Sequence, residues 1–180
     1  MKILKTKIKN VTIFEPNLFR DNRGFFQETW NKKEFEKFFD KKIDFVQDNM
    51  SFSKKNVIRG LHYQIKNPQG KLVRVLKGSI LDVVVDLRKF SPTFSKSFSI
   101  ILSSTNKKIL WVPIGCAHGF KAITNADVSY KVTDYYSPEN ERCLFWNDPR
   151  LKIDWNIKGK PIISKKDQLG VFFEDAELFI

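Results

Sequence analysis

The chain has 180 residues, of which 42% are hydrophobic, so it is long enough for one domain to bury a core without disulfides. Its two cysteines, Cys116 and Cys143, form no CxxC pair and are too far apart for a secreted disulfide framework, which favours a reducing, cytoplasmic setting. The net charge of +12 comes from scattered lysines and arginines without a DNA- or RNA-binding motif, so we predict no nucleic-acid partner.

The N-terminal segment, "MKILKTKIKNVTIFEP", interleaves lysines with apolar residues and lacks the uninterrupted apolar stretch of a signal peptide. The sequence also contains no apolar run of about 18 residues, the length that predicts a transmembrane helix. We therefore expect a soluble, cytoplasmic protein with no membrane partner.

One early segment, residues 29–42, has the spacing of a helix. Phe35, Phe38 and Phe39 stand at positions i, i+3 and i+4, which places them on one helical face. Asn31 or Thr29 is a suitable N-cap for this helix. The C-terminal tail, residues 164–180, is expected to end in a short helix after Gly170 or to pack as an extended arm.

The rest of the chain has the pattern of a β protein. Short runs rich in β-branched and aromatic residues recur about every ten residues, many of them separated by Gly, Pro, Asn or Ser. This pattern predicts an all-β sandwich or jelly roll in a single domain over residues 1–180. The predicted strands are residues 71–76, 79–87, 97–103, 107–113, 118–124 and 127–136.

The chain has only two histidines, and both lie in or beside these strands. His62 precedes Lys71 across the turn segment "IKNPQGK", and a hairpin there would bring both side chains to one face. His118 and Tyr130 follow on later strands and could point into the same barrel. A single histidine in a β protein is more often structural than catalytic, so these residues alone leave both possibilities open.

Several longer motifs resemble the dTDP-4-dehydrorhamnose 3,5-epimerase family. They are "FEPNLFRDNRGFFQETWN", "RGLHYQ", "QGKLVRVLKGSILDVVVDLRKFSPTF", "LWVPIGCAHGF", "YKVTDYYSPENE" and "WNDPRLKIDW". The similarity extends from about residue 8 to Asp167, in the family's order and spacing. It implies a cupin-type jelly roll with a few short helices, a homodimer, and inversion of carbon centres in a nucleoside-diphosphate 4-keto-6-deoxy sugar without a cofactor.

The resemblance also implies catalytic roles. His62 corresponds to the general base, for which an imidazole is suited near neutral pH. Tyr130 corresponds to the acid on the other face of the sugar, and Lys71 to the cation that stabilises an enolate oxygen. Asp167, in "SKKD", corresponds to the partner of the base, and Asp82 is expected to hold Lys71 in place.

Substrate-binding residues carry over from the same resemblance. We expect cationic or imidazole contacts to the diphosphate or sugar oxygens, further polar contacts to the nucleotide sugar, and aromatic contacts that include stacking on the base. The cationic and imidazole contacts are expected from Arg23, Arg59, His118 and Lys166. The further polar contacts are expected from Glu28, Gln47, Asn49 and Glu141, and the aromatic contacts from Phe26 and Tyr136.

Many cupins hold a metal with several histidines and a carboxylate. Here Gln64 occupies the position two residues after His62, and His118 is the only other histidine, so we predict no metal cofactor. Cys116 is interpreted as a small buried apolar residue.

Two other functions stay open at this stage, a nucleotide-sugar 3,4-ketoisomerase and a non-catalytic sugar-nucleotide-binding cupin. The sequence also leaves open whether the nucleotide is dTDP or GDP and whether the sugar is a hexose or a heptose. It does not decide whether carbon 3, carbon 5 or both are inverted.

Overall fold

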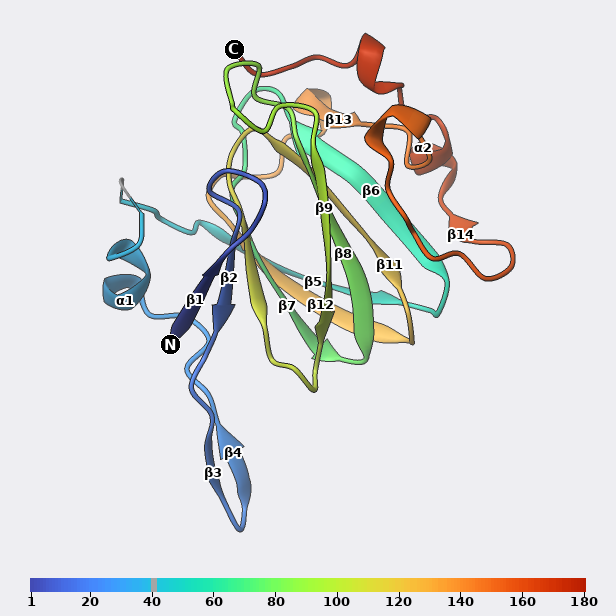
Figure 1. Cartoon of the computed structure of the whole chain (residues 1–180). Helices are drawn as coiled ribbons and strands as arrows, with labels where there is room; N and C mark the ends of the chain where they lie inside the picture. Colours follow the sequence, from blue (N-terminus) through green and yellow to red (C-terminus); the bar gives the residue numbers. More distant parts are fainter. Residues whose placement is uncertain (40–41) are drawn as a thin grey trace.

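Two antiparallel sheets face each other in the computed structural model, which describes residues 1–39 and 42–180 (Figure 1). The first sheet has the strand order β1 (Lys2–Lys5), β2 (Thr12–Glu15), β10 (Ile109–Val112), β7 (Lys71–Lys77), β12 (Ala126–Val132) and β5 (Gln47–Ser53). The second has the order β13 (Glu141–Cys143), β6 (Val57–Gln64), β11 (Cys116–Ala122), β8 (Ser79–Asp86) and β9 (Ser97–Ser103), and β14 (Ile162–Ile163) pairs in parallel with β6. The predicted all-β sandwich is confirmed.

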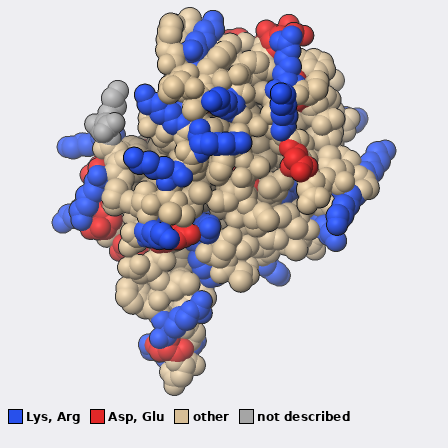
Figure 2. Space-filling view, viewed as in Figure 1, with Lys and Arg blue, Asp and Glu red and all other residues tan. Residues whose placement is uncertain are grey.

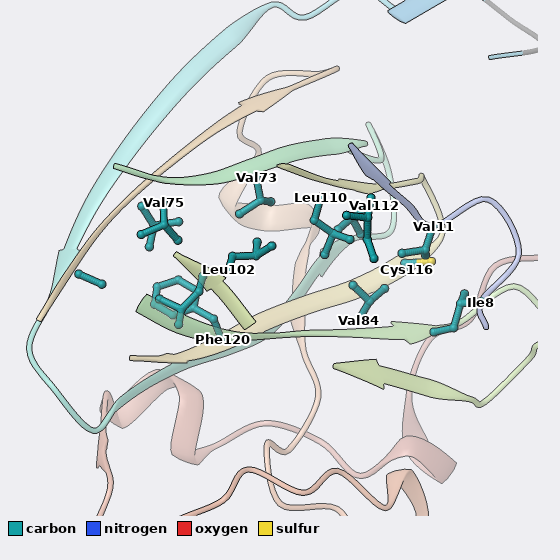
Figure 3. Packing of buried hydrophobic residues seen from close by; sticks show 14 residues of the cluster. Ile8, Val11, Val73, Val75, Val84, Leu102, Leu110, Val112, Cys116 and Phe120 are labelled. Atoms are coloured by element: carbon teal, nitrogen blue, oxygen red, sulfur yellow. The ribbon is translucent and has the colours of Figure 1, made fainter. Parts of the chain in front are cut away.

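Side chains that alternate along the strands fill the space between the sheets with an apolar core. Val73 and Val75 of β7 point toward Val84 of β8 and Phe120 of β11 (Figure 3). Cys116 lies in the same cluster and is 3% exposed, as a buried apolar residue would be. Because side chains at i and i+2 share one face of a strand, the same alternation directs residues such as His62, Lys71 and Tyr130 inward.

The outer face of the second sheet is also covered. The segment after β13 contains η2 (Pro149–Leu151), α2 (Lys165–Gln168) and η3 (Phe173–Asp175), and its Leu144, Leu151 and Trp155 pack on Ile58, Leu61 and Val83. A further short helix, η1 (Pro138–Asn140), precedes β13. The C-terminal tail thus forms an arm with a short helix, and this arm brings α2 beside β6.

The predicted helix is present but short. It spans α1 (Lys32–Glu36), and the Asn31 side chain accepts a hydrogen bond from Glu34 N, as expected of its N-cap. Phe35 is buried against Phe14, whereas Phe38 is 45% exposed, so the apolar face covers little more than one turn. Residues 40–41 of the predicted helix lie outside the described residues.

The expected hairpin between His62 and Lys71 is wrong. β6 belongs to the second sheet and β7 to the first, so the segment that joins them crosses the sandwich. The two residues therefore approach each other from opposite sheets, and the Lys71 ammonium donates to the His62 carbonyl oxygen at 3.3 Å.

A real hairpin projects from the body of the molecule. β3 (Phe19–Asp21) pairs with β4 (Gly24–Phe26), and the two strands extend well beyond the sandwich (Figure 1). Phe19 and Phe26 on this hairpin are 61% and 68% exposed. Elsewhere on the visible face lysines and arginines are dispersed, in agreement with their scatter along the sequence (Figure 2). Among the described residues, no helix is long and apolar enough to cross a membrane.

Candidate active site

A cavity of about 360 Å³ lies between the two sheets beside the apolar core. Its size falls in the range of small-ligand sites in proteins. Both sheets contribute to its wall, and most of the predicted site residues line it. These are Gln47, Asn49, Arg59, His62, Lys71, His118, Tyr130, Tyr136 and Glu141.

His62 is paired with Asp167 at the edge of this cavity. Its Nε2 atom lies 2.7 Å from Asp167 Oδ1, and the second carboxylate oxygen accepts the Gly60 N–H at 3.2 Å. Ser164 caps α2 by accepting the Asp167 N–H, which fixes the carboxylate toward β6. Burial alone would raise the pKa of Asp167, but the hydrogen bond and charge of His62 hold that pKa below its usual value.

A second histidine–aspartate pair lies next to the first. His118 and His62 are direct cross-strand partners on β11 and β6, and His118 Nε2 lies 2.8 Å from Asp82 Oδ1. Asp82 therefore holds His118, which corrects the expectation that it holds Lys71. Its other oxygen, Oδ2, is buried without a hydrogen-bond partner among the described residues, and its charge still favours the Lys71 ammonium.

Lys71 and Tyr130 face the two histidines from the first sheet. Lys71 is only 9% exposed, and burial lowers the pKa of its ammonium to about 8, although the charges of Glu141 and Asp82 oppose this effect. Burial raises the pKa of the Tyr130 phenol. At neutral pH the cavity therefore contains a mostly protonated lysine and a neutral tyrosine.

The mouth of the cavity is ordered by polar contacts around Glu141. Its carboxylate accepts hydrogen bonds from Tyr136 Oη at 2.8 Å and from the Lys166 ammonium. Burial of Glu141 would raise its pKa, but these two donors hold it below its usual value. Tyr136 N in turn donates to Gln47 Oε1 at 3.1 Å, and the Gln47 amide donates to Asn49 Oδ1 at 2.8 Å.

Arg59 is held by its own strand neighbourhood rather than by an acid. Its Nε atom donates to Ser53 Oγ at 2.9 Å and an Nη atom donates to the Phe52 carbonyl at 3.0 Å. The guanidinium charge is thus oriented beside the cavity without a carboxylate partner in these contacts. Such an arginine is suited to an anionic ligand.

Three predicted binding residues are not brought to this cavity. Arg23 lies on the projecting hairpin, where it pairs with Asp21 at 2.7 Å and its side chain is 86% exposed. Phe26 is on the same hairpin, and Glu28 follows it and accepts a hydrogen bond from Asn31 at 3.0 Å. Within one chain these residues do not contribute to the cavity wall.

Sequence reasoning missed two neighbours of the site. Gln64 lines the cavity, where its amide donates to the Tyr135 and Asn67 carbonyls and accepts from Ser137 N. Its position two residues after His62 on one strand was a signal for this placement. Cys143 is the direct cross-strand partner of His62 on β13, and no local pattern in the sequence indicated that pairing.

Comparison with known proteins agrees with this arrangement. Residues 5–175 match the family model described as dTDP-4-dehydrorhamnose 3,5-epimerase. A protein of that name from Pseudomonas aeruginosa is 49% identical over 180 residues, covering 99% of both chains. The chain belongs to the dTDP-4-dehydrorhamnose 3,5-epimerase family. The predicted family and the predicted enzyme class, an epimerase among the isomerases, are confirmed.

Solved structures of this epimerase family share the fold. A dTDP-6-deoxy-D-glucose-3,5-epimerase from Legionella pneumophila in complex with dTDP-4-keto-L-rhamnose is 44% identical, covers 98% of this chain and 94% of its own, and has a TM-score of 0.95. A 3'-monoepimerase from Streptomyces bikiniensis in complex with dTDP-quinovose is 27% identical, covers 94% and 86%, and has a TM-score of 0.89. The cupin-type jelly roll is thereby confirmed.

Proposed function

We propose that this epimerase acts on a dTDP-linked 4-keto-6-deoxy sugar and inverts carbons 3 and 5 through an enolate, as a step in making surface-polysaccharide sugars. The observation that carries this proposal is the placement of His62 and Tyr130 on opposite sheets around one cavity, with Lys71 between the same walls. The family name and the dTDP-sugar in the Legionella relative support dTDP over the GDP-linked alternative.

The chemistry requires a base and an acid on opposite faces of the sugar ring. Carbons 3 and 5 both neighbour the carbon 4 ketone, so loss of a proton from either carbon gives an enolate. Return of a proton to the opposite face inverts the centre. If the base and the acid lay on the same side of the sugar ring, the proton would return to the face it left. Groups from two opposite sheets can act on opposite faces, and this arrangement permits inversion.

His62 is the proposed base, and Asp167 positions it. A ring N–H at Nε2 donates to the Asp167 carboxylate, which leaves the lone pair on Nδ1 for the substrate proton. The carboxylate also stabilises the imidazolium that forms when the proton arrives. His62 retains 27% exposure of its side chain, so it stays accessible from the cavity.

Lys71 and Tyr130 complete the proposed machinery. The Lys71 ammonium stabilises the developing enolate oxygen, and the interaction is strengthened by the low dielectric of its buried position. Tyr130 donates its phenolic proton on the face opposite His62, and its raised pKa keeps that proton in place until the enolate forms. No step requires a metal or an organic cofactor.

The remaining cavity residues are assigned to binding. We assign Arg59, the His118–Asp82 pair and, beside the cavity, Lys166 to the diphosphate or sugar oxygens, and Gln47, Asn49 and Glu141 to polar contacts with the nucleotide sugar. Tyr136, at the mouth and 51% exposed, is suited to stacking on the base.

A homodimer is part of the proposal because it accounts for the hairpin residues. Arg23, Phe26 and Glu28 resemble substrate-binding residues of the family but lie outside the cavity of their own chain. The exposed aromatic side chains of the hairpin need a covering surface. We assign that surface to a second copy, whose cavity the hairpin would then complete. We also assign residues 1–180 to one domain and the protein to the cytoplasm.

Turnover of defined substrates tests the function. Proton NMR of the protein with dTDP-4-keto-6-deoxyglucose should show conversion to the product inverted at carbons 3 and 5, and GDP-linked 4-keto sugars should react far more slowly. A shift of the ketone to carbon 3 would identify a ketoisomerase instead. Tight binding without any reaction would identify a binding protein.

A further inference from the structure

The half-buried thiol of Cys143 lies against the His62–Asp167 pair. Cys143 on β13 is the cross-strand partner of His62 on β6, and Asp167 reaches the same place from α2. One ligand atom from each of the three side chains lies within 4.8 Å of the other two. Among the described residues, the one hydrogen bond of the Cys143 thiol is donated to the Leu144 carbonyl at 3.4 Å.

The three side chains form a donor set for a borderline divalent cation. Thiolate, imidazole and carboxylate are the ligands of zinc in proteins, with bonds of roughly 2.0–2.3 Å. In a tetrahedral site with such bonds the ligand atoms lie roughly 3–4 Å apart. Side-chain shifts of about 1 Å would therefore bring the ligand atoms of His62, Asp167 and Cys143 to the spacing that a bound metal requires. Magnesium prefers six oxygen ligands and would find one carboxylate here.

We propose that His62, Asp167 and Cys143 form a binding site for Zn²⁺, and that Zn²⁺ bound there inhibits the enzyme. The metal would bind the His62 Nε2 atom that now bonds Asp167, the proton of that nitrogen would move to Nδ1, and the thiol proton would pass to solvent as the thiolate forms. The inhibition rests on the proposed role of His62 as the base, whereas the binding itself does not.

The surrounding charges are compatible with a cation. The Asp167 carboxylate is buried beside Cys143 and His62, and Glu141 lies on the same strand as Cys143, two residues away. The nearest basic side chain on α2, Lys166, is already paired with Glu141. Tetrahedral zinc sites with three protein ligands keep a fourth position for water or substrate, and here the cavity that His62 lines would supply it.

Cobalt(II) spectroscopy and inhibition by zinc test the proposal together. Co²⁺ added anaerobically to the protein should produce a thiolate-to-metal charge-transfer band that Zn²⁺ abolishes, and micromolar Zn²⁺ should inhibit epimerisation, with EDTA restoring full activity. Cys143→Ser and Cys143→Ala should keep basal activity, lose the band, and require at least about tenfold more Zn²⁺ for inhibition.

The composition of the chain makes the controls simple. It has two cysteines and two histidines, so a thiolate band can arise only from Cys143 or from Cys116 in the core. Cys116→Ala should retain both the band and the inhibition, and His62→Asn should weaken Co²⁺ binding. A band or a zinc sensitivity that survives in both Cys143 variants would overturn the site. An inactive protein that still shows the band would instead refute the proposed function.

Discussion

At the scale of single residues, burial distinguishes the two histidine–aspartate pairs. His118 and Asp82 are 9% and 0% exposed as side chains, whereas the His62 side chain is 27% exposed. Both pairs have similar N–O distances, 2.8 and 2.7 Å, so accessibility rather than hydrogen-bond geometry favours His62 as the group that reaches the substrate. His118 is better suited to a fixed binding contact.

The charge of Lys71 leads to a pH prediction. Its pKa is lowered to about 8 by burial, and the ammonium is the form that stabilises an enolate, so kcat/KM should fall as the pH rises through about 8. Lys71→Arg should react more slowly but lose this alkaline fall, because a guanidinium stays protonated there. An identical alkaline fall in Lys71→Arg would assign it to another group.

At the scale of elements, the site depends on how closely β6 approaches β11. Gly60 has φ of +100°, and a Cβ atom at this position would lie 2.6 Å from the His118 carbonyl oxygen and 2.7 Å from Gly119 Cα. The atoms that would clash belong to the backbone of β11, which cannot move aside as a flexible side chain could. The glycine therefore sets the spacing of the strands that carry His62 and His118.

Gly60→Ala should consequently destabilise the protein by about 1–3 kcal/mol or more, and it should reduce activity by displacing His118 from His62. Gly159→Ala is a matched control, because Gly159 also has positive φ, +80°, but no described atom beyond its chain neighbours lies within 4 Å of its Cβ position. Urea unfolding of both variants measures the difference. Equal losses of stability would contradict the argument from close approach.

The periodicity of the strands predicted the sheets well, because alternation is a local property that burial enforces. It could not predict that β6 and β7 lie in different sheets, since the turn between them is compatible with a hairpin or a crossover. Nor could it predict that Asp82 bonds His118, because alternation indicates the face of the sheet on which a side chain lies but not which side chain it contacts. Asp167 lies 105 residues from His62, so only the family resemblance indicated it.

At the scale of the whole molecule, the projecting hairpin does not line the cavity of its own chain. Its phenylalanines are exposed, and among the described residues the Arg23 guanidinium pairs only with Asp21, two residues away. A symmetric dimer would place each hairpin against the other copy, because a two-fold axis makes such an exchange reciprocal. Light scattering at micromolar concentration should therefore give the mass of a dimer.

Mixing two impaired variants tests whether the hairpin contributes to the partner's cavity. Arg23→Ala should weaken substrate binding by about 1.5–3 kcal/mol, the worth of charged hydrogen bonds, and His62→Asn should remove the base. After equal mixing and subunit exchange, half of the dimers would be hybrids with one intact site, so activity at low substrate should recover to about a quarter of wild type. No recovery would mean that Arg23 acts in its own chain, and full activity of Arg23→Ala before mixing would mean that it has no role.

The proposed mechanism depends most on His62 as the base that removes a substrate proton, and solvent exchange measures that step directly. In deuterated water the wild-type protein should place deuterium at carbon 3 and carbon 5 of dTDP-4-keto-6-deoxyglucose. His62→Asn, which has no basic nitrogen, should slow this exchange by roughly 10²- to 10⁴-fold while still binding dTDP. Tyr130→Phe should continue to exchange while inversion slows, leaving deuterium in unepimerised substrate. Exchange at the wild-type rate in His62→Asn would contradict the assignment of His62 as the base.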